Sequence, residues 1–454
     1  MSDTAKMPAM DETVRRRLLT RKERSRAGKD LRDKVPHEAL GEWAPPSNRP
    51  DPIKTIHTSH IGRRQDLVPL RIERMSENPY SFLRGAADIM AWDIAQVPYT
   101  GLMPVACGDM HLGNVGFYRS PEGDIVLDLN DFDEAHTGAW EWDIRRLTVS
   151  IWVAGRENGN SEDECHDAVL ACVAAYQAEL RRLSDMPLLS RAFNRFDVHR
   201  LEETVTEQSL RGEIERTVRK AQKNSSDRKL PKITSGEGDD RRIVEDPPVV
   251  LRVSDQRADE IAEALDAYLP TLTDQWRRVV GSYYLSDVAH KVVGVGSVGL
   301  RAYLALLEGS DPSDVLFLQL KQARRSVLAP FVHGEVARHR HQGQRVVEYQ
   351  QELQTVSDPL LGWTSIGDMQ FYVRQWRNQQ GTIDLGSISP GALRDYAGII
   401  GHLLAKGHAR TSGASRIAGY LGKSDRAAQA FAKWARAYAD QTEADHAAFV
   451  KAMG

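Results

Sequence analysis

The sequence predicts an α+β protein with a small antiparallel β part and a larger helical part. Several strand-like apolar runs fall between residues 286 and 380, and turn signals separate the first three of them. Stretches with helical spacing lie on either side, from about 142 to 184 and from 391 to the end. Strands that follow one another without an intervening helix favour antiparallel pairing over a parallel βαβ arrangement.

The composition is that of an ordinary globular protein of two or three domains. The chain has 454 residues, 41% of them hydrophobic and 27% charged, with a formal net charge of -3. This balance gives no global attraction to nucleic acid or to a membrane, and we expect neither as a partner. Three cysteines without a CxxC pair, and an N-terminus without an apolar secretory core, lead us to expect a cytoplasmic protein.

We divide the chain into four parts. Residues 1–65 are polar, basic and rich in proline, and we expect an arm that is extended or only partly helical. Residues 66–285 form the first part of a helical region, with a polar, flexible insertion at 209–248. Residues 286–380 are the β-rich part, and residues 381–454 supply the remaining helices.

The stretch GDMHLGNVGFYRSPEGDIVLDLNDFDEA, residues 108–135, carries several side chains suited to chemistry. Two strand-like pieces, NVGFYR and DIVLDL, are joined by the turn signal SPEG, so a hairpin brings their ends together. Asn114 and Asp131 at these ends offer the oxygen ligands that Mg²⁺ prefers, with phosphates and water completing its shell. Asp109 then remains available to orient a hydroxyl and accept its proton, and His111 to brace the loop.

Each of these residues also has a plainer interpretation, because Asp and Asn are common turn residues. The combination of D-x-H-x-x-N, a hairpin and D-F-D is hard to obtain from turn chemistry alone. Asp128 and Asp133 are interpreted either as solvated or structural groups or as functional ones. Asp133 is also a candidate contact for an acceptor or a phosphate.

The glycine-rich stretch VVGVGSVG, residues 292–299, contains G-x-G-x-x-G. Dinucleotide-binding folds use this spacing to open a helix, whereas kinases use it between two antiparallel strands, where backbone amides cover the phosphates. Strand-like residues follow here and deliver a lysine within VLFLQLK, and no acidic ribose-binding residue ends a second strand. Both features favour the kinase-type use. The candidate nucleotide-binding residues are Gly294, Gly296, Ser297, Gly299 and Lys321.

A lysine in this role needs a carboxylate to hold its ammonium group against the phosphates. Glu335, Glu348 and Glu352 are the candidates on the helix that follows. We favour Glu348, because Val346 and Val347 beside it indicate a partly buried face. The alternative is a solvated helix glutamate. Similarity to the kinase order of parts implies that the strand QFYVRQW leads into a hinge that binds adenine through backbone hydrogen bonds.

The motifs GDMHLGN and NDFDEA resemble the catalytic loop and metal segment of the aminoglycoside-phosphotransferase-like branch of the protein-kinase-like superfamily. By position, the resemblance implies that Asp109 is the catalytic base and that Asn114 and Asp131 bind magnesium. Asp143 in EWDIRRL resembles the buried aspartate that ties the next helix to the catalytic loop. The stretch YAGIIGHLLAKGHART, residues 396–411, resembles the helix that precedes the catalytic loop in kinases.

The order of these parts is rotated relative to ordinary kinases, because the catalytic loop comes before the glycine stretch. The implied fold is therefore a bilobal protein-kinase-like fold in circularly permuted order. Permutation is tolerated where the termini and the break point are exposed. It predicts that the helix ending near His408 packs under the loop that begins near Cys107.

Residues 40–450 also resemble a bacterial family of uncharacterised proteins, domain of unknown function 2252. The resemblance rests on PYSFLRGAA, GDMHLGNVGF, LNDFDEAHTGAWEWDIRRL, KVVGVGSVGLRAYLALLEG and SDPLLGW. The family supplies no substrate, so the functional interpretation depends on the motifs.

We expect an ATP- and magnesium-dependent phosphotransferase that acts on a hydroxyl group. A small molecule is the favoured acceptor, and a protein is the second candidate. One alternative is a nucleotide-binding regulator without transfer activity. Another is a metal-dependent phosphohydrolase with Asp109, His111, Asp131 and Asp133 as ligands, which leaves the glycine stretch and Lys321 without a role.

Arg84 in SFLRGAA has two interpretations. A guanidinium group suits bidentate phosphate binding, so Arg84 is a candidate contact for the acceptor or a phosphate. Alternatively, it forms a structural salt bridge on a helix surface. No motif identifies the acceptor or the oligomeric state.

Overall fold

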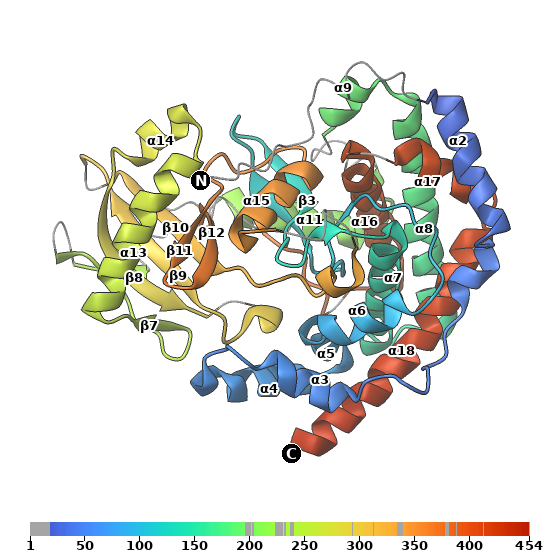
Figure 1. Cartoon of the computed structure of the whole chain (residues 1–454), viewed down its shortest axis with the longest axis horizontal. Helices are drawn as coiled ribbons and strands as arrows, with labels where there is room; N and C mark the ends of the chain where they lie inside the picture. Colours follow the sequence, from blue (N-terminus) through green and yellow to red (C-terminus); the bar gives the residue numbers. More distant parts are fainter. Residues whose placement is uncertain are drawn as a thin grey trace, which may run out of the picture.

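A six-stranded antiparallel sheet and an assembly of long helices make up the structure, which is a computed structural model (Figure 1). The predicted α+β class is therefore confirmed. The structure describes residues 19–453 without 196–200, 202–203, 223–229, 231–232, 237–239, 293, 312, 334–338, 377–380, 387 and 412. Within this part of the chain, no helix combines the length and the hydropathy needed to cross a membrane.

The strands of the large sheet run in the order β11-β12-β10-β9-β8-β7, and every neighbouring pair is antiparallel. The central strand β9 is buried along its whole length, because hydrophobic clusters cover both faces of the sheet. The strands span Val250–Arg252 (β7), Tyr284–Lys291 (β8), Ala302–Glu308 (β9), Val315–Gln322 (β10), Gly362–Ile366 (β11) and Met369–Gln375 (β12).

Helices α13 (Asp255–Tyr268) and α14 (Asp274–Val280) belong to the β part of the molecule. Ile261 and Tyr268 of α13 share a hydrophobic cluster with Leu318 of the sheet. The β part therefore begins near β7 and not at residue 286, where the sequence placed the boundary. The periodicity of α13 correctly indicates an amphipathic helix, but periodicity does not reveal which core that helix covers.

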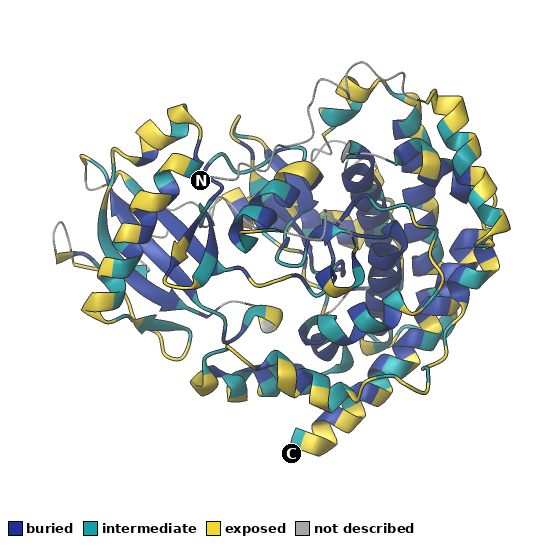
Figure 2. Cartoon of the chain, viewed as in Figure 1, coloured by how far each residue is buried: buried dark blue, intermediate teal, exposed yellow. Residues whose placement is uncertain are grey.

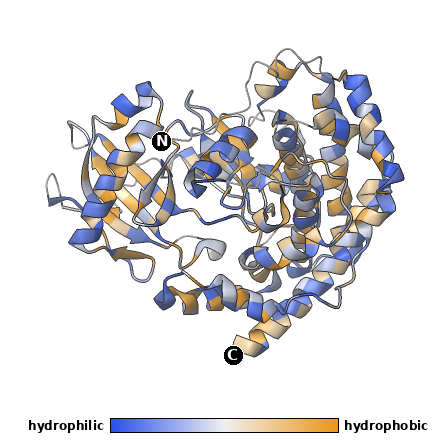
Figure 3. Ribbon diagram, viewed as in Figure 1, coloured by the Kyte–Doolittle hydropathy of each residue, from blue (hydrophilic) through white to orange (hydrophobic). Residues whose placement is uncertain are grey.

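The helical part is built around α7 (Trp140–Glu157), in which every residue from Trp140 to Gly155 is buried. Figure 2 shows α7 and α16 largely in dark blue, whereas the outer helix α2 is mostly yellow. Figure 3 shows the strands largely orange and α2 largely blue, as burial of apolar surface requires. The other long helices are α8 (Glu162–Asp185), α16 (Pro390–Thr411), α17 (Ala414–Leu421) and α18 (Arg426–Met453).

The N-terminal arm is more helical than the sequence suggests. Helix α2 (Arg21–Asp30) packs against α17, and α3 (Pro52–Ser59) packs against α6 and α18. Residues 1–18 of the predicted arm lie outside the described residues. Three more helices complete this side, α4 (Val68–Ser76), α5 (Pro79–Gly85) and α6 (Ala87–Ala95).

The predicted flexible insertion at 209–248 coincides in its first part with a helix, α11 (Gln208–Gln222), which packs against α16. Its pattern has a buried face made by Leu210, Ile214 and Thr217. Several of the later positions lie outside the described residues. The remaining elements are β1 (Val105–Ala106), β2 (Val115–Arg119), β3 (Ile125–Leu129), β4 (His136–Thr137), α9 (Leu188–Ala192), β5 (Thr234–Ser235), β6 (Arg242–Ile243) and α15 (Gln342–Leu353).

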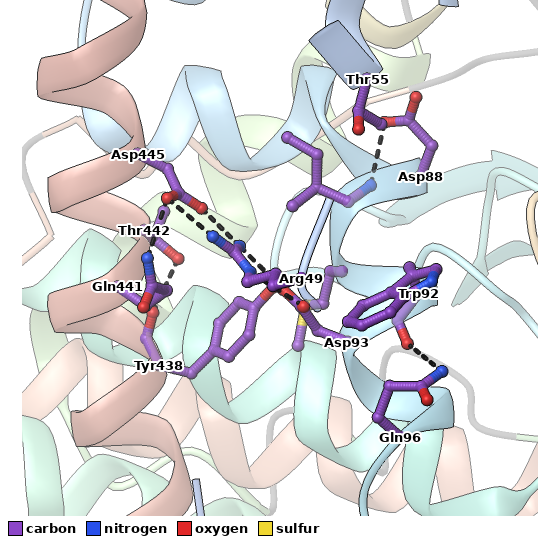
Figure 4. Close-up of polar contacts among 12 residues, drawn as sticks. Arg49, Thr55, Asp88, Trp92, Asp93, Gln96, Tyr438, Gln441, Thr442 and Asp445 are labelled. Carbon is purple, nitrogen blue, oxygen red and sulfur yellow. Dashed lines mark hydrogen bonds and ion pairs between the residues drawn. The ribbon is translucent and has the colours of Figure 1, made fainter. Parts of the chain in front are cut away.

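Arg49 fastens the N-terminal arm to the helical part (Figure 4). Its guanidinium group lies 2.8 Å from the Asp93 carboxylate of α6 and 2.6 Å from the Asp445 carboxylate of α18. The Tyr438 hydroxyl donates a further hydrogen bond of 2.7 Å to Asp93. Burial raises the pKa of Asp93, although Arg49 and Tyr438 oppose the shift. The Asp93 carboxylate therefore depends on Arg49 for its charge.

We predict that Arg49→Met lowers the free energy of unfolding by about 3–5 kcal/mol, because it leaves a buried carboxylate without its cation. The measurement is urea denaturation followed by circular dichroism. Arg21→Met is the matched control, because the Arg21–Asp185 pair is largely exposed and should contribute little. Equal losses of stability in the two variants would contradict the assignment.

Candidate functional site

The predicted hairpin is present and brings its two ends together. Strands β2 and β3 pair with Val115 opposite Leu129, and the Asn130 amide donates to the Asn114 carbonyl oxygen at 3.0 Å. Asn114 and Asp131 therefore lie at the same end of the hairpin. The Asn114 side-chain amide donates to the Asp109 carbonyl oxygen, so its oxygen remains available to another group.

Asp143 at the start of α7 holds the beginning of this loop. Its carboxylate accepts hydrogen bonds from the amides of Cys107, at 2.6 Å, and Gly108, at 2.9 Å. His408 near the end of α16 lies 3.1 Å from the same carboxylate and is bonded on its other nitrogen to Tyr176. The predicted packing of this helix end against the loop is confirmed.

Gly108 permits the loop to approach the Asp131–Glu134 turn closely. Its φ is +79°, and an added Cβ would lie 2.1 Å from the Glu134 carbonyl oxygen. A residue with a side chain would be strained here and would separate the two segments.

Asp109 lies against Arg146, whose Nε donates to its carboxylate. Arg146 is itself fixed by a hydrogen bond of 2.8 Å from Nη2 to the Leu83 carbonyl oxygen. Burial raises the pKa of Asp109 to about 6, and Arg146 opposes the shift. The sequence interpretation missed Arg146. Its position three residues after Asp143, on the same helix face, was the available signal.

His111 is a buried, neutral member of the loop. Its Nδ1 accepts a hydrogen bond of 3.0 Å from the Gly113 amide, which agrees with the predicted bracing role. Burial lowers the pKa of His111 well below its usual value, and the charges of Arg84 and Arg146 act in the same direction. His111 is therefore uncharged at neutral pH.

The glycine-rich stretch connects β8 to β9, which are antiparallel neighbours. Apart from a single 3-10 turn at Val295–Ser297, the described residues between β8 and β9 form no helix. The predicted strand, glycine stretch and strand are thus confirmed, and the dinucleotide-type interpretation is wrong. Gly294 and Gly296 are exposed to the cavity, whereas the Gly299 carbonyl oxygen accepts a hydrogen bond from the Arg64 amide at 2.8 Å.

Lys321 on β10 is buried and pairs with the acidic segment. Its Nζ lies 2.9 Å from Asp133 Oδ2 and 3.9 Å from Asp131 Oδ1. Burial opposes the charge of Lys321, but the two carboxylates raise its pKa above the usual value. The two motifs, far apart in the sequence, therefore meet at this ammonium group.

The predicted pair between Lys321 and Glu348 is not formed. The Glu348 carboxylate accepts a hydrogen bond of 2.7 Å from the side chain of Gln344 on its own helix, α15. The α15 residue that faces the site is Arg345, which donates 2.7 Å to the Asp133 carbonyl oxygen. Apolar neighbours indicated that α15 is partly buried, but they did not fix its rotation. Glu335 lies outside the described residues.

Asp133 occupies the position that the sequence interpretation gave to a glutamate. Oδ1 accepts a hydrogen bond of 2.7 Å from the Tyr372 hydroxyl, and Oδ2 accepts one of 3.2 Å from Ser297 Oγ. Burial alone would raise the pKa of Asp133, but Lys321 and Tyr372 lower it below the usual value. Asp133 is therefore a charged link between the hairpin, the glycine stretch and two strands of the sheet.

Asp128 is structural. Its carboxylate lies 2.5 Å from Lys406 Nζ of α16, and both side chains are buried. This ion pair joins β3 to the helical part and does not line the cavity.

A cavity of about 570 Å³ lies between the hairpin, the glycine stretch and helices α3 to α5. The volume falls in the range of about 300–1,000 Å³ that is typical of ligand sites. Gly299, Glu348 and Asp143 do not line it. The predicted residues that do are Arg84, Asp109, His111, Asn114, Asp131, Asp133, Gly294, Gly296, Ser297 and Lys321.

Arg84 lies close to the glycine stretch and acts on the loop that carries Asp109. An added Cβ at Gly294 would lie 4.0 Å from Arg84 Nη2, and its positive charge acts on Asp109 and His111. The predicted alternative of a structural salt bridge is not observed, because Arg84 has no ion pair among the described residues. It lies instead 5.9 Å from the centre of the Tyr80 ring.

The chain matches the model of a family described as uncharacterized protein conserved in bacteria (DUF2252), over residues 63–452. The chain belongs to this family. The match spans the hairpin, the glycine stretch and helices α4 to α18, so it covers nearly the whole cavity of this DUF2252 protein. Neither the curated proteins nor the solved structures contain a match to the chain.

We predict that Asp133→Asn lowers the free energy of unfolding of the DUF2252 protein by about 2–3 kcal/mol. This is less than the roughly 3–5 kcal/mol of a fully broken buried pair, because Asp131 stays near Lys321. Glu348→Gln, the matched control, should change stability by less than about 0.5 kcal/mol. Chemical denaturation of both variants measures the difference. A larger loss for Glu348→Gln would restore that residue as the partner of Lys321.

Proposed function

We propose that this DUF2252 protein is an ATP- and magnesium-dependent phosphotransferase with a bilobal, kinase-like arrangement in circularly permuted order. The observation that carries the proposal is the meeting of the two motifs at one cavity. Asp109, Asn114 and Asp131 reach it from the hairpin, and Lys321 reaches it from β10. The sheet with its glycine stretch would bind the nucleotide, and the helical part would bind the acceptor.

The residues present fit a magnesium ion. Asp131 offers a carboxylate whose side chain is 42% exposed, and Asn114 offers a side-chain oxygen that its own amide hydrogen bond leaves free. Both line the cavity, and one or two protein oxygens with phosphate oxygens are the usual set for Mg²⁺. Bound there, the ion would neutralise charge on the phosphates.

Asp109 has the position and the pKa of a proton acceptor. In the proposed reaction, the acceptor hydroxyl oxygen forms a bond to the γ-phosphorus of ATP and the bond from that phosphorus to the β-γ bridging oxygen breaks. The hydroxyl proton passes to Asp109, and ADP leaves with the former bridging oxygen. Arg146 would orient the Asp109 carboxylate, because it holds one of its oxygens. Lys321 and the glycine-stretch backbone would position the phosphates.

The phosphohydrolase alternative draws less support from the geometry. It requires Asp109, His111, Asp131 and Asp133 to converge on metal. Asp133 is instead bonded to Lys321, Tyr372 and Ser297, and Asp109 is bonded to Arg146.

We predict that the protein binds ATP with a micromolar dissociation constant in the presence of Mg²⁺, as measured by calorimetry. Lys321→Ala and Asp131→Ala should each weaken binding at least tenfold, because they remove a phosphate contact and a metal ligand. Asp109→Ala should bind ATP within about twofold of wild type but lose transfer by a factor of about 10²–10⁴.

Three outcomes of these measurements distinguish the phosphotransferase from its two alternatives. No binding of ATP by the wild type would refute the phosphotransferase. Tight binding of ATP with neither transfer to an acceptor nor slow hydrolysis of ATP would favour a regulator. Phosphatase activity that survives Lys321→Ala would favour the phosphohydrolase.

We predict that the rate of transfer falls as pH decreases through about 6. The raised pKa of Asp109 means that its carboxyl group is protonated below this pH and cannot accept a proton. Above it, the carboxylate form dominates and the rate should reach a plateau. The measurement is kcat/KM between pH 5 and 8, with ATP hydrolysis as the readout if no acceptor is known. A flat profile, or a rate that increases at low pH, would exclude Asp109 as the base.

A further inference from the structure

One wall of the cavity is formed by arginines that the proposed chemistry does not use. Arg63 precedes α4, Arg71 lies within α4, Arg84 lies in α5, and Arg324 follows β10. All four line the cavity. We call them the arginine wall.

Three members of the wall, Arg63, Arg71 and Arg324, donate hydrogen bonds to backbone oxygens and not to carboxylates. Arg63 Nε and Arg324 Nη1 donate to the same acceptor, the Ser59 carbonyl oxygen, at 3.0 and 3.3 Å. Arg63 Nη1 also donates 2.6 Å to the carbonyl oxygen of Val298. Two guanidinium groups thus converge on one oxygen. Within the described part of the chain, none of the four arginines has a carboxylate oxygen within 4.0 Å.

Arg71 is the clearest case. Only 1% of the residue is exposed, and its Nη2 donates a hydrogen bond of 2.7 Å to the Gly85 carbonyl oxygen. In the part of the chain that the structure describes, its Nε and Nη1 atoms have no hydrogen-bond partner, and the same holds for Nε of Arg84. Buried donors are nearly always satisfied, so unpaired guanidinium nitrogens beside a cavity indicate a missing acceptor.

Two acids that line the cavity, Asp88 and Glu134, offset the charge of the wall only in part, because neither forms an ion pair with it among the described residues. Burial lowers the pKa of Arg63 to about 9 and that of Arg71 to about 10, and the other arginines act in the same direction. The charge of Asp88 acts in the opposite direction on both arginines, and that of Glu134 does so on Arg63, while burial raises the pKa of Asp88 itself. Lys321, which lines the same cavity, differs because two carboxylates lie within 4.0 Å of its ammonium group. A buried charge without a partner destabilises the empty protein, and an anion that binds there removes this cost.

We propose that the arginine wall binds a phosphate group carried by the acceptor, so that the acceptor is a phosphorylated alcohol. The inference rests on the proposed phosphotransferase function, because that function requires an acceptor to bind beside the nucleotide. A guanidinium group can donate two parallel hydrogen bonds to two oxygens of one phosphate. Several guanidinium groups around one site suit a phosphate dianion better than a singly charged carboxylate. Arg84, next to both Asp109 and the glycine stretch, places the wall beside the reacting hydroxyl.

The test is calorimetry of inorganic phosphate binding to the whole protein, with and without a saturating non-hydrolysable ATP analogue and Mg²⁺. The variants are Arg71→Met, which keeps the apolar stem, and Arg63→Gln at a half-buried position. Arg74→Gln is the matched control, because it removes the same charge from α4 at a residue that does not line the cavity. Sodium acetate serves as the carboxylate probe.

The proposal expects phosphate to bind the analogue-loaded wild type, with affinity at least tenfold lower in Arg71→Met and Arg63→Gln. Arg74→Gln should differ by less than about twofold, and acetate should bind at least tenfold more weakly than phosphate. Phosphate should also raise the melting temperature of the wild type but not of Arg71→Met. Affinity for the ATP analogue should stay within about twofold in all variants.

Four results would overturn the proposal. They are an absence of phosphate binding, equal affinity in all variants, acetate binding as tight as phosphate, and displacement of phosphate by the ATP analogue. The last would assign the wall to the nucleotide. Failure of the analogue to bind would refute the phosphotransferase and the acceptor assignment together, whereas phosphate titrated alone would still show whether the wall binds an anion.

Discussion

The buried ion pair between Lys321 and Asp133 is the interaction on which the site depends, because it joins two segments that lie far apart in the chain. Moving two charges out of water is costly, and their attraction offsets that cost only when further hydrogen bonds satisfy them. Tyr372 and Ser297 supply these bonds to Asp133. The pair therefore fixes the position of the hairpin relative to the sheet.

Helix α7 provides the second constraint from the opposite side. Asp143 in its first turn holds the backbone at the start of the loop, and Arg146 one turn later holds the Asp109 carboxylate. Because α7 is buried on all sides, neither residue can move without disturbing the core. His408 of α16 reaches the same Asp143 carboxylate, so a helix near the C-terminus supports a loop near residue 108. Such contacts require only that the two segments be close in space, whichever of them comes first in the sequence.

Local patterns in the sequence predicted the features that local chemistry determines. The hairpin followed from two strand-like pieces around SPEG, and the antiparallel connection followed from strand-forming residues after Gly299. The role of Asp143 in holding the loop was inferred from the resemblance to the protein-kinase-like superfamily. The motif also identified every polar residue that the hairpin contributes to the cavity except Glu134.

Features that depend on tertiary packing were not predictable in the same way. The rotation of α15 decides whether Arg345 or Glu348 faces the acidic segment, and neighbouring valines indicate burial without its direction. The assignment of α13 to the sheet required knowing which apolar face it covers. The arginine wall was invisible for the same reason, since Arg63 and Arg324 converge on Ser59 only in the folded chain.

The two positive centres of the cavity differ in a way that bears on their ligands. Lys321 is already balanced by Asp131 and Asp133, so a ligand that binds there must bring its own compensating cation. A nucleoside triphosphate with bound Mg²⁺ meets this condition. Among the described residues, the arginine wall has no carboxylate paired with it, and Arg71 keeps unpaired nitrogens in a buried position. An anion that carries no metal suits that wall, because only its own charge offsets the buried guanidinium groups. In the proposed phosphotransferase, this difference in local charge assigns the metal-bound nucleotide to Lys321 and the metal-free acceptor to the arginine wall.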